Sequence, residues 1–315
     1  MMHIDENTAA GAGDEPGTHR LAGRTVSRAG FGTRQLSRPG HPQPVDRDTG
    51  VGLLRRAVEL GVNHVDTADY YGAGVANDLI RAALSPYPAD LAIVSKVGVQ
   101  FDNREGLAPA QLPEQLRAGV DENLRRLGTE QLAAVYLRRV DTGPRLLATG
   151  HQQVDLEDQL AELVALRDEG KIGGIGLSNV NVDQLRRALP AGIACVQNFH
   201  NVLERDGEPV LDECRRQEVP WVPFFPLGSP SVDPTIINHP TVRAVAQDVG
   251  ARPAQVALAW LLAQDSSTLL VPGTLNPGHL AENVAALRID LGASALHTLD
   301  AVAPPARSTP PTASE

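Results

Sequence analysis

The chain has 315 residues, a formal net charge of −10, and 42% hydrophobic residues. This composition supports a large folded core, and an acidic chain without a dense block of lysine or arginine is not expected to bind nucleic acid. No run approaches the ~20 apolar residues that a membrane-spanning helix needs, so we expect no membrane partner.

The two ends of the chain differ in composition from the part between them. Residues 1–20 are polar and acidic and lack the basic start and apolar segment of a signal peptide, while residues 304–315 are rich in Pro, Ala, Ser and Thr. We therefore expect two flexible tails that flank a single domain over residues 21–303.

Short apolar strands alternate with amphipathic helices between the tails. We predict eight strands, at about residues 28–32, 63–66, 92–96, 133–137, 174–177, 195–198, 219–225 and 268–271. The clearest helical spacings fall at residues 51–60, 112–127 and 156–169, and Gly61, Gly170 and Gly250 stand where helices should end. Residues 240–249 form an extra helical stretch, which we place on a loop at the active face.

Eight strands, each followed by a helix, indicate an α/β fold, a single (β/α)₈ TIM barrel. An open doubly wound sheet is the second possibility. It is disfavoured because no glycine-rich GxGxxG turn opens the first helix.

The polar residues at three strand ends indicate proton-transfer chemistry. Asp66 ends the second strand, Tyr71 lies in the loop after it, Lys96 ends the third strand and Arg138 follows the fourth. Active sites of such barrels lie at the carboxyl ends of strands, which are about 5 Å apart, so these side chains can share one mouth. A nearby lysine would lower the pKa of the phenol from about 10 and make a tunable general acid. Asp66 alone could cap a turn and Tyr71 alone could cover the barrel mouth. The acid, phenol and amine together at consecutive strand ends favour a catalytic role.

The two cysteines, Cys195 and Cys214, lack metal-ligand spacing, and Cys195 lies in the apolar run IACV, which predicts a buried thiol. The scattered histidines show no zinc-type pairing, so we expect no metal site. This cysteine usage is typical of a cytoplasmic protein.

Eight segments carry a family resemblance: RAGFGT at 28–33, GVNHVDTADYYG at 61–72, SK at 95–96, GKIGGIGLSN at 170–179, VQN at 196–198, FPLG at 225–228, VPGT at 271–274 and EN at 282–283. In this order and spacing the chain resembles the aldo-keto reductase superfamily from about residue 25 to 301. The resemblance implies a TIM barrel that uses NADP(H), or less often NAD(H), to interconvert a carbonyl and an alcohol.

The same resemblance implies roles for individual residues. Asp66, Tyr71 and Lys96 match three of the four catalytic residues. The implied cofactor contacts are Ser178, Asn179 and Gln197 on the nicotinamide carboxamide, Phe224 on its ring, and Gly32, Thr33, Leu227, Gly273, Thr274, His279, Glu282 and Asn283 elsewhere. Without the resemblance, Phe224 would be interpreted as a core aromatic.

Arg138 stands where the family's fourth catalytic residue, a histidine, is expected. It could donate a hydrogen bond to a substrate oxygen, and its charge would push Tyr71 toward phenolate. We therefore hypothesise a bias toward alcohol oxidation or toward a substrate with an anionic group. The alternative is that Arg138 turns to solvent and the enzyme is poor or inactive.

Gly273 and His279 replace the lysine and arginine that many family members offer to a 2′-phosphate. Thr274, Asn276 and His279, with the helix start near Asn276, could still bind the phosphate, so NADP(H) is expected and NAD(H) stays open. Taken together, the sequence predicts an oxidoreductase acting on a small carbonyl or alcohol. A dinucleotide-binding relative without turnover, or one with a non-redox activity, is the competing class. The substrate and the oligomeric state stay open.

Overall fold

Six parallel strands form the central sheet of the computed structural model, which describes residues 17–37, 45–102, 106–141, 146–228 and 236–302. Their order across the sheet is β10 (Ile193–Gln197), β9 (Ile175–Ser178), β8 (Ala134–Arg138), β5 (Ala92–Val97), β4 (His64–Asp66) and β3 (Phe31–Gly32). Adjacent strands are mostly neighbours in the sequence, as expected for repeated strand–helix units.

The predicted seventh and eighth strands are held by single bridges rather than by ladders. Trp221 bridges Val196 of β10, and the Leu269 amide donates to the Trp221 carbonyl at 2.8 Å. The Gly30 amide, just before β3, donates to the Leu270 carbonyl at 2.7 Å. Backbone hydrogen bonds therefore run from β10 back to β3, and the prediction of an α/β barrel is confirmed, with shorter strands at its seam than the sequence suggested.

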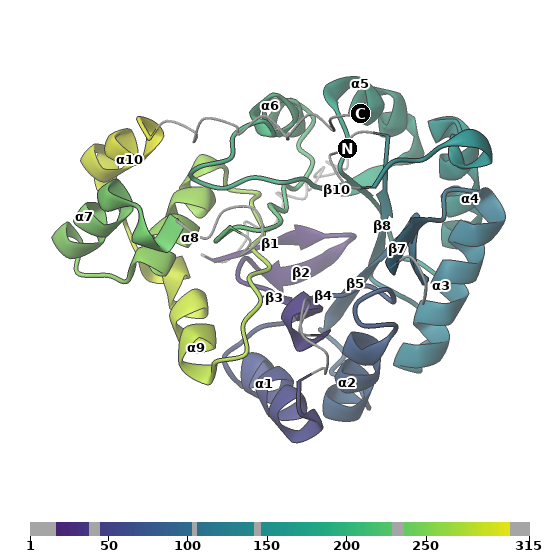
Figure 1. Cartoon of the computed structure of the whole chain (residues 1–315), viewed down its shortest axis with the longest axis horizontal. Helices are drawn as coiled ribbons and strands as arrows, with labels where there is room; N and C mark the ends of the chain where they lie inside the picture. The colour runs from purple at the N-terminus through teal and green to yellow at the C-terminus, as the bar shows by residue number, and fades with distance from the viewer. Residues whose placement is uncertain (1–16, 38–44, 103–105, 142–145, 229–235, 303–315) are drawn as a thin grey trace, which may run out of the picture.

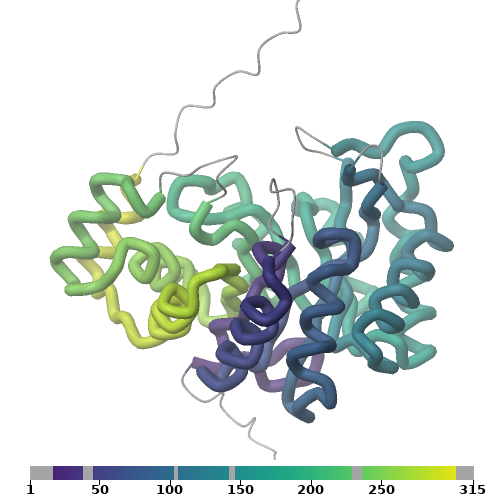
Figure 2. Tube along the Cα trace, turned by 60° about the horizontal axis from the view of Figure 1, so that its bottom comes forward, coloured from purple at the N-terminus to yellow at the C-terminus, as the bar shows by residue number. Residues whose placement is uncertain are grey.

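The helices surround the strands in chain order (Figures 1 and 2). They are α1 (Arg47–Glu59), α2 (Val75–Leu84), α3 (Pro113–Leu127), α4 (Leu156–Asp168), α5 (Val182–Ala188), α6 (Glu208–Arg216), α7 (Pro240–Asp248), α8 (Pro253–Gln264), α9 (Pro277–Ala285) and α10 (Gly292–Asp300). Gly61, Gly170 and Gly250 follow helices with positive φ angles, as predicted.

The strands divide their side chains between two layers. The side chains of Val135 and Leu137 pack outward against the helices, whereas Ala134 and Tyr136 belong to a cluster inside the strand ring. Because side chains alternate along a strand, Arg138 continues the inward row. The same alternation places the carboxyl-terminal polar residues of the neighbouring strands inside the ring.

A hairpin that was not predicted covers the amino-terminal end of the ring, where Ser27 and Arg24 bind Asn63 and the Ala89 carbonyl ahead of β4 and β5. It pairs β1 (Thr18–Leu21) with β2 (Arg24–Ser27), and its Leu21 and Val26 are fully buried against the inner cluster. Residues 18–20 thus belong to this hairpin and not to the tail that was predicted to end at residue 20, while residues 1–16 and 304–315 of the predicted tails lie outside the described residues. A second unpredicted hairpin joins β6 (Val99–Asp102) to β7 (Gly106–Pro109).

Within the described residues, no helix has the length and apolar character to cross a membrane.

Candidate active site

A buried ion pair joins the ends of β4 and β5. The Lys96 Nζ donates to Asp66 Oδ1 at 2.5 Å and to the Thr67 carbonyl at 2.9 Å, and both charged side chains are about 5% exposed. Gln197 Nε2, from the end of β10, donates to the other carboxylate oxygen of Asp66 at 2.9 Å. Burial alone would lower the pKa of Lys96, but the charge and hydrogen bond of Asp66, together with Tyr71 and Tyr70, outweigh it and the pKa is raised. Lys96 is therefore a firmly charged ammonium.

Tyr71 lies beside this pair, with the Lys96 Nζ 5.1 Å from its ring centroid. The structure thus brings together the carboxylate, phenol and amine singled out in the sequence. The predicted direction of the phenol's pKa shift is wrong: burial raises the pKa of Tyr71 to about 12, and the lowering effects of Lys96 and Arg138 do not offset it. Arg138 does lower the pKa of Tyr71, as expected, but burial outweighs this effect, so the shift gives no support to a bias toward alcohol oxidation.

Arg138 is held at the mouth by Tyr70. Its Nη1 donates to the Tyr70 hydroxyl at 3.2 Å, and its guanidinium carbon lies 5.8 Å from the Tyr70 ring centroid. The Tyr70 and Tyr71 rings meet edge to face at 5.2 Å. Arg138 is half-buried in this setting and does not turn fully into solvent.

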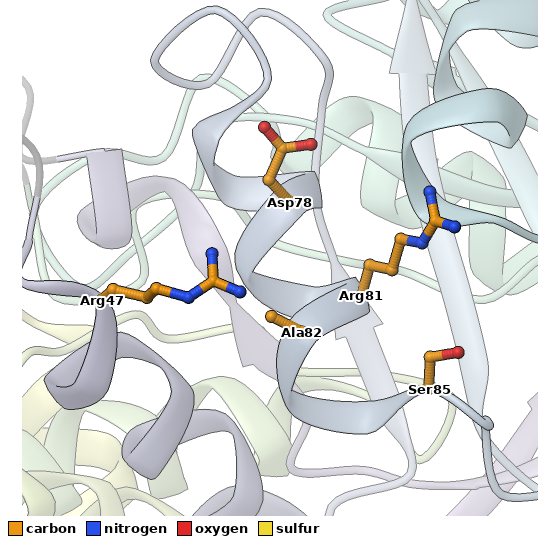
Figure 3. A pocket seen from close by; sticks show the side chains of 5 residues that line it. All are labelled: Arg47, Asp78, Arg81, Ala82 and Ser85. Atoms are coloured by element: carbon orange, nitrogen blue, oxygen red, sulfur yellow. The ribbon is translucent and has the colours of Figure 1, made fainter.

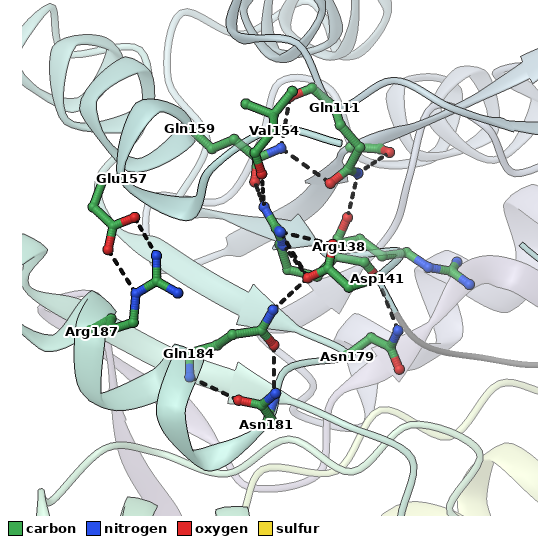
Figure 4. Close-up of polar contacts among 12 residues, drawn as sticks. Gln111, Arg138, Asp141, Val154, Glu157, Gln159, Asn179, Asn181, Gln184 and Arg187 are labelled. Carbon is green, nitrogen blue, oxygen red and sulfur yellow. Dashed lines mark hydrogen bonds and ion pairs between the residues drawn. The ribbon is translucent and has the colours of Figure 1, made fainter. Parts of the chain in front are cut away.

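A polar network fixes the backbone of β8 where Arg138 leaves it (Figure 4). Gln111 Nε2 donates to the Arg138 carbonyl at 2.9 Å, and Gln159 Nε2 donates to the Gln111 carbonyl at 2.7 Å. The next residue, Arg139, is buried and pairs with Asp141 at 2.7 Å. Figure 4 shows the Arg138 side chain extending away from this network. Arg139 is thus a structural anchor, and Arg138 is left to face the mouth.

The residues predicted to hold the nicotinamide carboxamide lie together. Ser178 and Gln197 are paired in register at the ends of β9 and β10, and Ser178 is buried. Asn179 follows in a left-handed conformation (φ 59°) and donates from Nδ2 to the Arg139 carbonyl at 2.9 Å. Because Gln197 uses one N–H on Asp66, its side-chain oxygen and its second N–H are left to offer to a ligand.

Three phenylalanines gather beyond the ends of β10 and the bridged segment after it. Phe224 stacks on Phe199 at 5.6 Å with an interplanar angle of 10°, and Phe225 meets both rings edge-on. Arg34, in the short 3₁₀ helix Thr33–Ser37 after β3, lies 5.2 Å over the Phe225 ring. Phe199 was not among the residues predicted from the sequence. Its position two residues after Gln197, just past the end of a strand, could have indicated that it lies near the mouth.

Two predicted cofactor residues, Gly32 and Gly273, also have a structural reason to be glycine. A Cβ on Gly32 would lie 2.3 Å from the Val271 carbonyl oxygen, and a Cβ on Gly273 would lie 2.5 Å from the Gly32 carbonyl oxygen. Only glycine permits this approach of two backbones at the seam of the barrel. Nearby, the buried Thr33 donates from Oγ1 to the Asp66 carbonyl at 3.0 Å.

The start of α9 is already capped by the chain itself. Asn276 Oδ1 accepts from the amides of Gly278 (2.7 Å) and His279 (3.3 Å), and Thr274 Oγ1 accepts from the Asn276 amide at 3.1 Å. A phosphate that uses these two amides would have to displace the Asn276 side chain, and its binding at this helix start stays a prediction.

Two other expected cofactor contacts, Glu282 and Asn283, lie further along α9. Glu282 lies 3.6 Å from Arg252, a cation that the sequence reading missed. Asn283 is buried, whereas Leu227 is half-exposed.

Other features of the described residues offer no competing centre. A hollow of about 370 Å³ lies on the outer side of α2, away from every predicted site residue; Figure 3 shows the side chains that line it. A second hollow, of about 250 Å³, is lined by Arg139 and Asp141. Both cysteines are buried and free, and burial raises the pKa of each thiol to about 12. No group of three or more metal-ligating side chains occurs in the described part of the chain.

Comparison with known proteins gives consistent matches. A sequence model of the Aldo/keto reductase family matches residues 28–304. Pyridoxine 4-dehydrogenase of Escherichia coli (strain K12) is 40% identical over 289 residues, covering 90% of this chain and 98% of that protein. An uncharacterized oxidoreductase of Schizosaccharomyces pombe is 34% identical, covering 91% and 90%. The crystal structure of an aldo-keto reductase from Klebsiella pneumoniae in complex with NADPH superposes with a TM-score of 0.77 at 25% identity, covering 94% of this chain and 98% of that one.

Proposed function

This chain belongs to the aldo/keto reductase family, and we propose that it uses NADP(H) to interconvert a carbonyl group and an alcohol at the mouth of the barrel. One observation carries the proposal: Lys96 is 2.5 Å from Asp66 and 5.1 Å from the ring centroid of Tyr71, inside the strand ring. A buried cation beside a protonated phenol is an arrangement suited to giving a proton to a carbonyl oxygen.

The chemistry of the side chains at the mouth fits a nicotinamide. A carboxamide needs both donors and acceptors, and Ser178, Asn179 and Gln197 supply both from two adjacent strand ends. At the adenosine end we place Gly273, Thr274, His279, Glu282 and Asn283. We propose NADP(H) as the cofactor, because Arg252, close to Glu282, is a cation that could bind the 2′-phosphate. This end lacks the usual lysine, so NAD(H) is the second possibility.

In the proposed mechanism, the hydride exchanged at the substrate carbon would be supplied or accepted by the dinucleotide when it is bound. Tyr71 gives its phenolic proton to the carbonyl oxygen as that oxygen gains negative charge. Its raised pKa, about 12, keeps it in the acid form at neutral pH. Lys96, held charged by Asp66, stabilises the phenolate that remains, and Arg138 donates a hydrogen bond to the same substrate oxygen.

For the substrate, we propose the class named in the Escherichia coli relative, an alcohol or aldehyde of the pyridoxine type. These compounds carry the reacting carbon on a flat pyridine ring. The cluster of Phe199, Phe224 and Phe225 supports this choice, because aromatic side chains stack on such rings.

The test compares Tyr71→Phe with Tyr87→Phe. Tyr87 lies before β5 and donates to the Leu127 carbonyl, so it controls for loss of a buried hydroxyl away from the mouth. Pyridoxal reduction is followed by NADPH consumption, and NADPH affinity by fluorescence titration. We expect Tyr71→Phe to lose at least about 10²-fold in kcat with its NADPH affinity retained, and Tyr87→Phe to keep its kcat. A Tyr71→Phe variant within threefold of the wild type would refute the role of Tyr71.

The same assays separate the competing functions. Binding of NADPH without turnover in the wild type, but with turnover in Arg138→His, would indicate a dinucleotide-binding protein that has lost catalysis. Failure to bind NADPH and NADH would overturn the cofactor proposal itself.

A further inference from the structure

We infer that Arg138, aimed by Tyr70, selects aromatic aldehydes that carry an oxyanion on the ring carbon next to the one that bears the reacting carbonyl group. The inference rests on the proposed function, because it concerns the same pocket. It assigns Arg138 a specificity role that a histidine could not fill, and it assigns Tyr70 a positioning role.

The first step is the charge balance at the mouth. Lys96 is neutralised by Asp66 within a short buried pair. Arg138 is half-buried and forms no ion pair with any residue that the structure describes. The groups that face it are the phenol rings of Tyr70 and Tyr71, with the Asp66–Lys96 pair behind them. A guanidinium that is always charged and lacks a carboxylate partner favours an anionic ligand.

The second step is where that anion must lie. Arg138 binds the Tyr70 hydroxyl, and the Tyr70 ring meets the ring of Tyr71, the proton donor, at 5.2 Å. A group bound to Arg138 is therefore close to the oxygen that Tyr71 protonates. An anion at the far end of a long substrate would not reach this place, whereas one on the adjacent ring carbon would.

The third step is the shape of the guanidinium. It has five N–H groups in one plane, and the contact with Tyr70 uses one of them at Nη1. The others can donate side by side to two oxygens in one plane, as they do to a carboxylate. The oxygen of a carbonyl group attached to an aromatic ring and a phenolate oxygen on the adjacent ring carbon present such a pair. A histidine has one N–H to offer at this position, so it cannot hold both.

The fourth step is the chemistry of the proposed substrate. The pyridine ring of pyridoxal carries an acidic hydroxyl on the carbon next to the one that bears the aldehyde. During reduction the carbonyl oxygen also becomes negative, so a fork that holds both oxygens binds the transition state more strongly than the aldehyde. The position of Arg138 is therefore suited to the aldehyde and adjacent hydroxyl of pyridoxal, a compound of the type named in the Escherichia coli relative.

The test uses benzaldehydes that isolate this group. Salicylaldehyde (2-hydroxybenzaldehyde) is compared with benzaldehyde, 2-methoxybenzaldehyde and 4-hydroxybenzaldehyde, measuring kcat/KM with NADPH and, independently of turnover, the Kd of each aldehyde in the presence of NADP⁺. We expect the wild type to prefer salicylaldehyde by at least about tenfold over the other three. The preference should grow as pH rises through the ionisation of the salicylaldehyde phenol, and 2-methoxybenzaldehyde should show no such change.

Variants assign the preference to residues. Arg138→Met should reduce the ratio of salicylaldehyde to benzaldehyde to within about threefold, and Tyr70→Phe should reduce it partly, because the guanidinium loses its anchor. Arg34→Met, which removes the other arginine near the mouth, should leave the ratio unchanged.

Two results would overturn the inference. One is equal kcat/KM and equal Kd for the four aldehydes in a wild type that reduces them, which would leave the proposed function standing. The other is an Arg138→Met variant that keeps the wild-type ratio and loses NADPH affinity, which would assign Arg138 to the cofactor. Absence of turnover together with an intact preference in Kd would refute the proposed redox activity and keep the anion site.

Discussion

Replacing Asp66 with asparagine should destabilise the protein strongly, because it removes one partner of a desolvated ion pair. At a separation of 2.5 Å and an effective dielectric constant of ~20, the gross attraction between the two charges is ~7 kcal/mol, most of it offset by desolvation. Losing only one partner leaves the buried Lys96 uncompensated, which typically costs ~3–5 kcal/mol. Asparagine also turns one acceptor into a donor, so either Lys96 or Gln197 would face an N–H group.

The assay is urea unfolding of Asp66→Asn, Lys96→Met and the double variant. We expect Asp66→Asn to lose ~3–5 kcal/mol in the free energy of unfolding, and the double variant to lose clearly less than the sum of the two single losses. Arg56→Met, which breaks the exposed pair with Glu59, is the matched control and should cost under ~1 kcal/mol. A loss below ~1 kcal/mol in Asp66→Asn, or additive losses in the double variant, would show that the pair is solvated and would refute the reasoning.

Three further outcomes are expected. His64 is fully buried and its pKa is lowered by burial to about 4, so the unfolded chain binds a proton that the folded chain does not. The free energy of unfolding should thus fall by ~3 kcal/mol as pH drops from about 6.5 to about 4. Urea midpoints measured across this pH range should fall less steeply in His64→Leu than in the wild type. Gly32→Ala should destabilise the protein by ~2 kcal/mol or more in thermal unfolding, whereas Gly52→Ala, in open space on α1, should stabilise it by ~1 kcal/mol. Tyr71 should stay protonated through pH 9, so ultraviolet titrations of the wild type and of Tyr71→Phe should show the same phenolate absorbance up to that pH. A phenolate signal near pH 8 that is present in the wild type and lost in Tyr71→Phe would contradict the raised pKa.

The site could be located from the sequence because strands alternate and barrels place their chemistry at one end. Asp66, Lys96 and Arg138 each stand at or beside the end of a short apolar run, and that position alone puts them on the inward face of adjacent strands. Ser178 and Gln197 follow the same rule on β9 and β10. The pattern needed no knowledge of how tightly the side chains pack.

Features that depend on packing could not be read from the sequence. The sign of the Tyr71 pKa shift is set by burial under neighbouring elements, which no local pattern reports. The capping of α9 by Asn276 depends on a rotamer, although asparagine before proline is a recognisable helix start. The N-terminal hairpin was missed because Leu21 and Val26 are too few to give a strand signal, and their burial comes from the barrel that they enter.

Arg138 and the raised pKa of Tyr71 are connected through the charge of the mouth. With Lys96 neutralised by Asp66, Arg138 is the uncompensated cation near the phenol among the described residues, yet burial still keeps Tyr71 protonated. An anion bound to Arg138 would cancel that cation and raise the pKa of Tyr71 further, since it removes an effect that lowers it. Substrate binding would thus hold Tyr71 in the acid form until the carbonyl oxygen becomes basic enough to take its proton. A permanent cation at the histidine position is therefore compatible with an acid catalyst when the substrate itself carries the balancing charge.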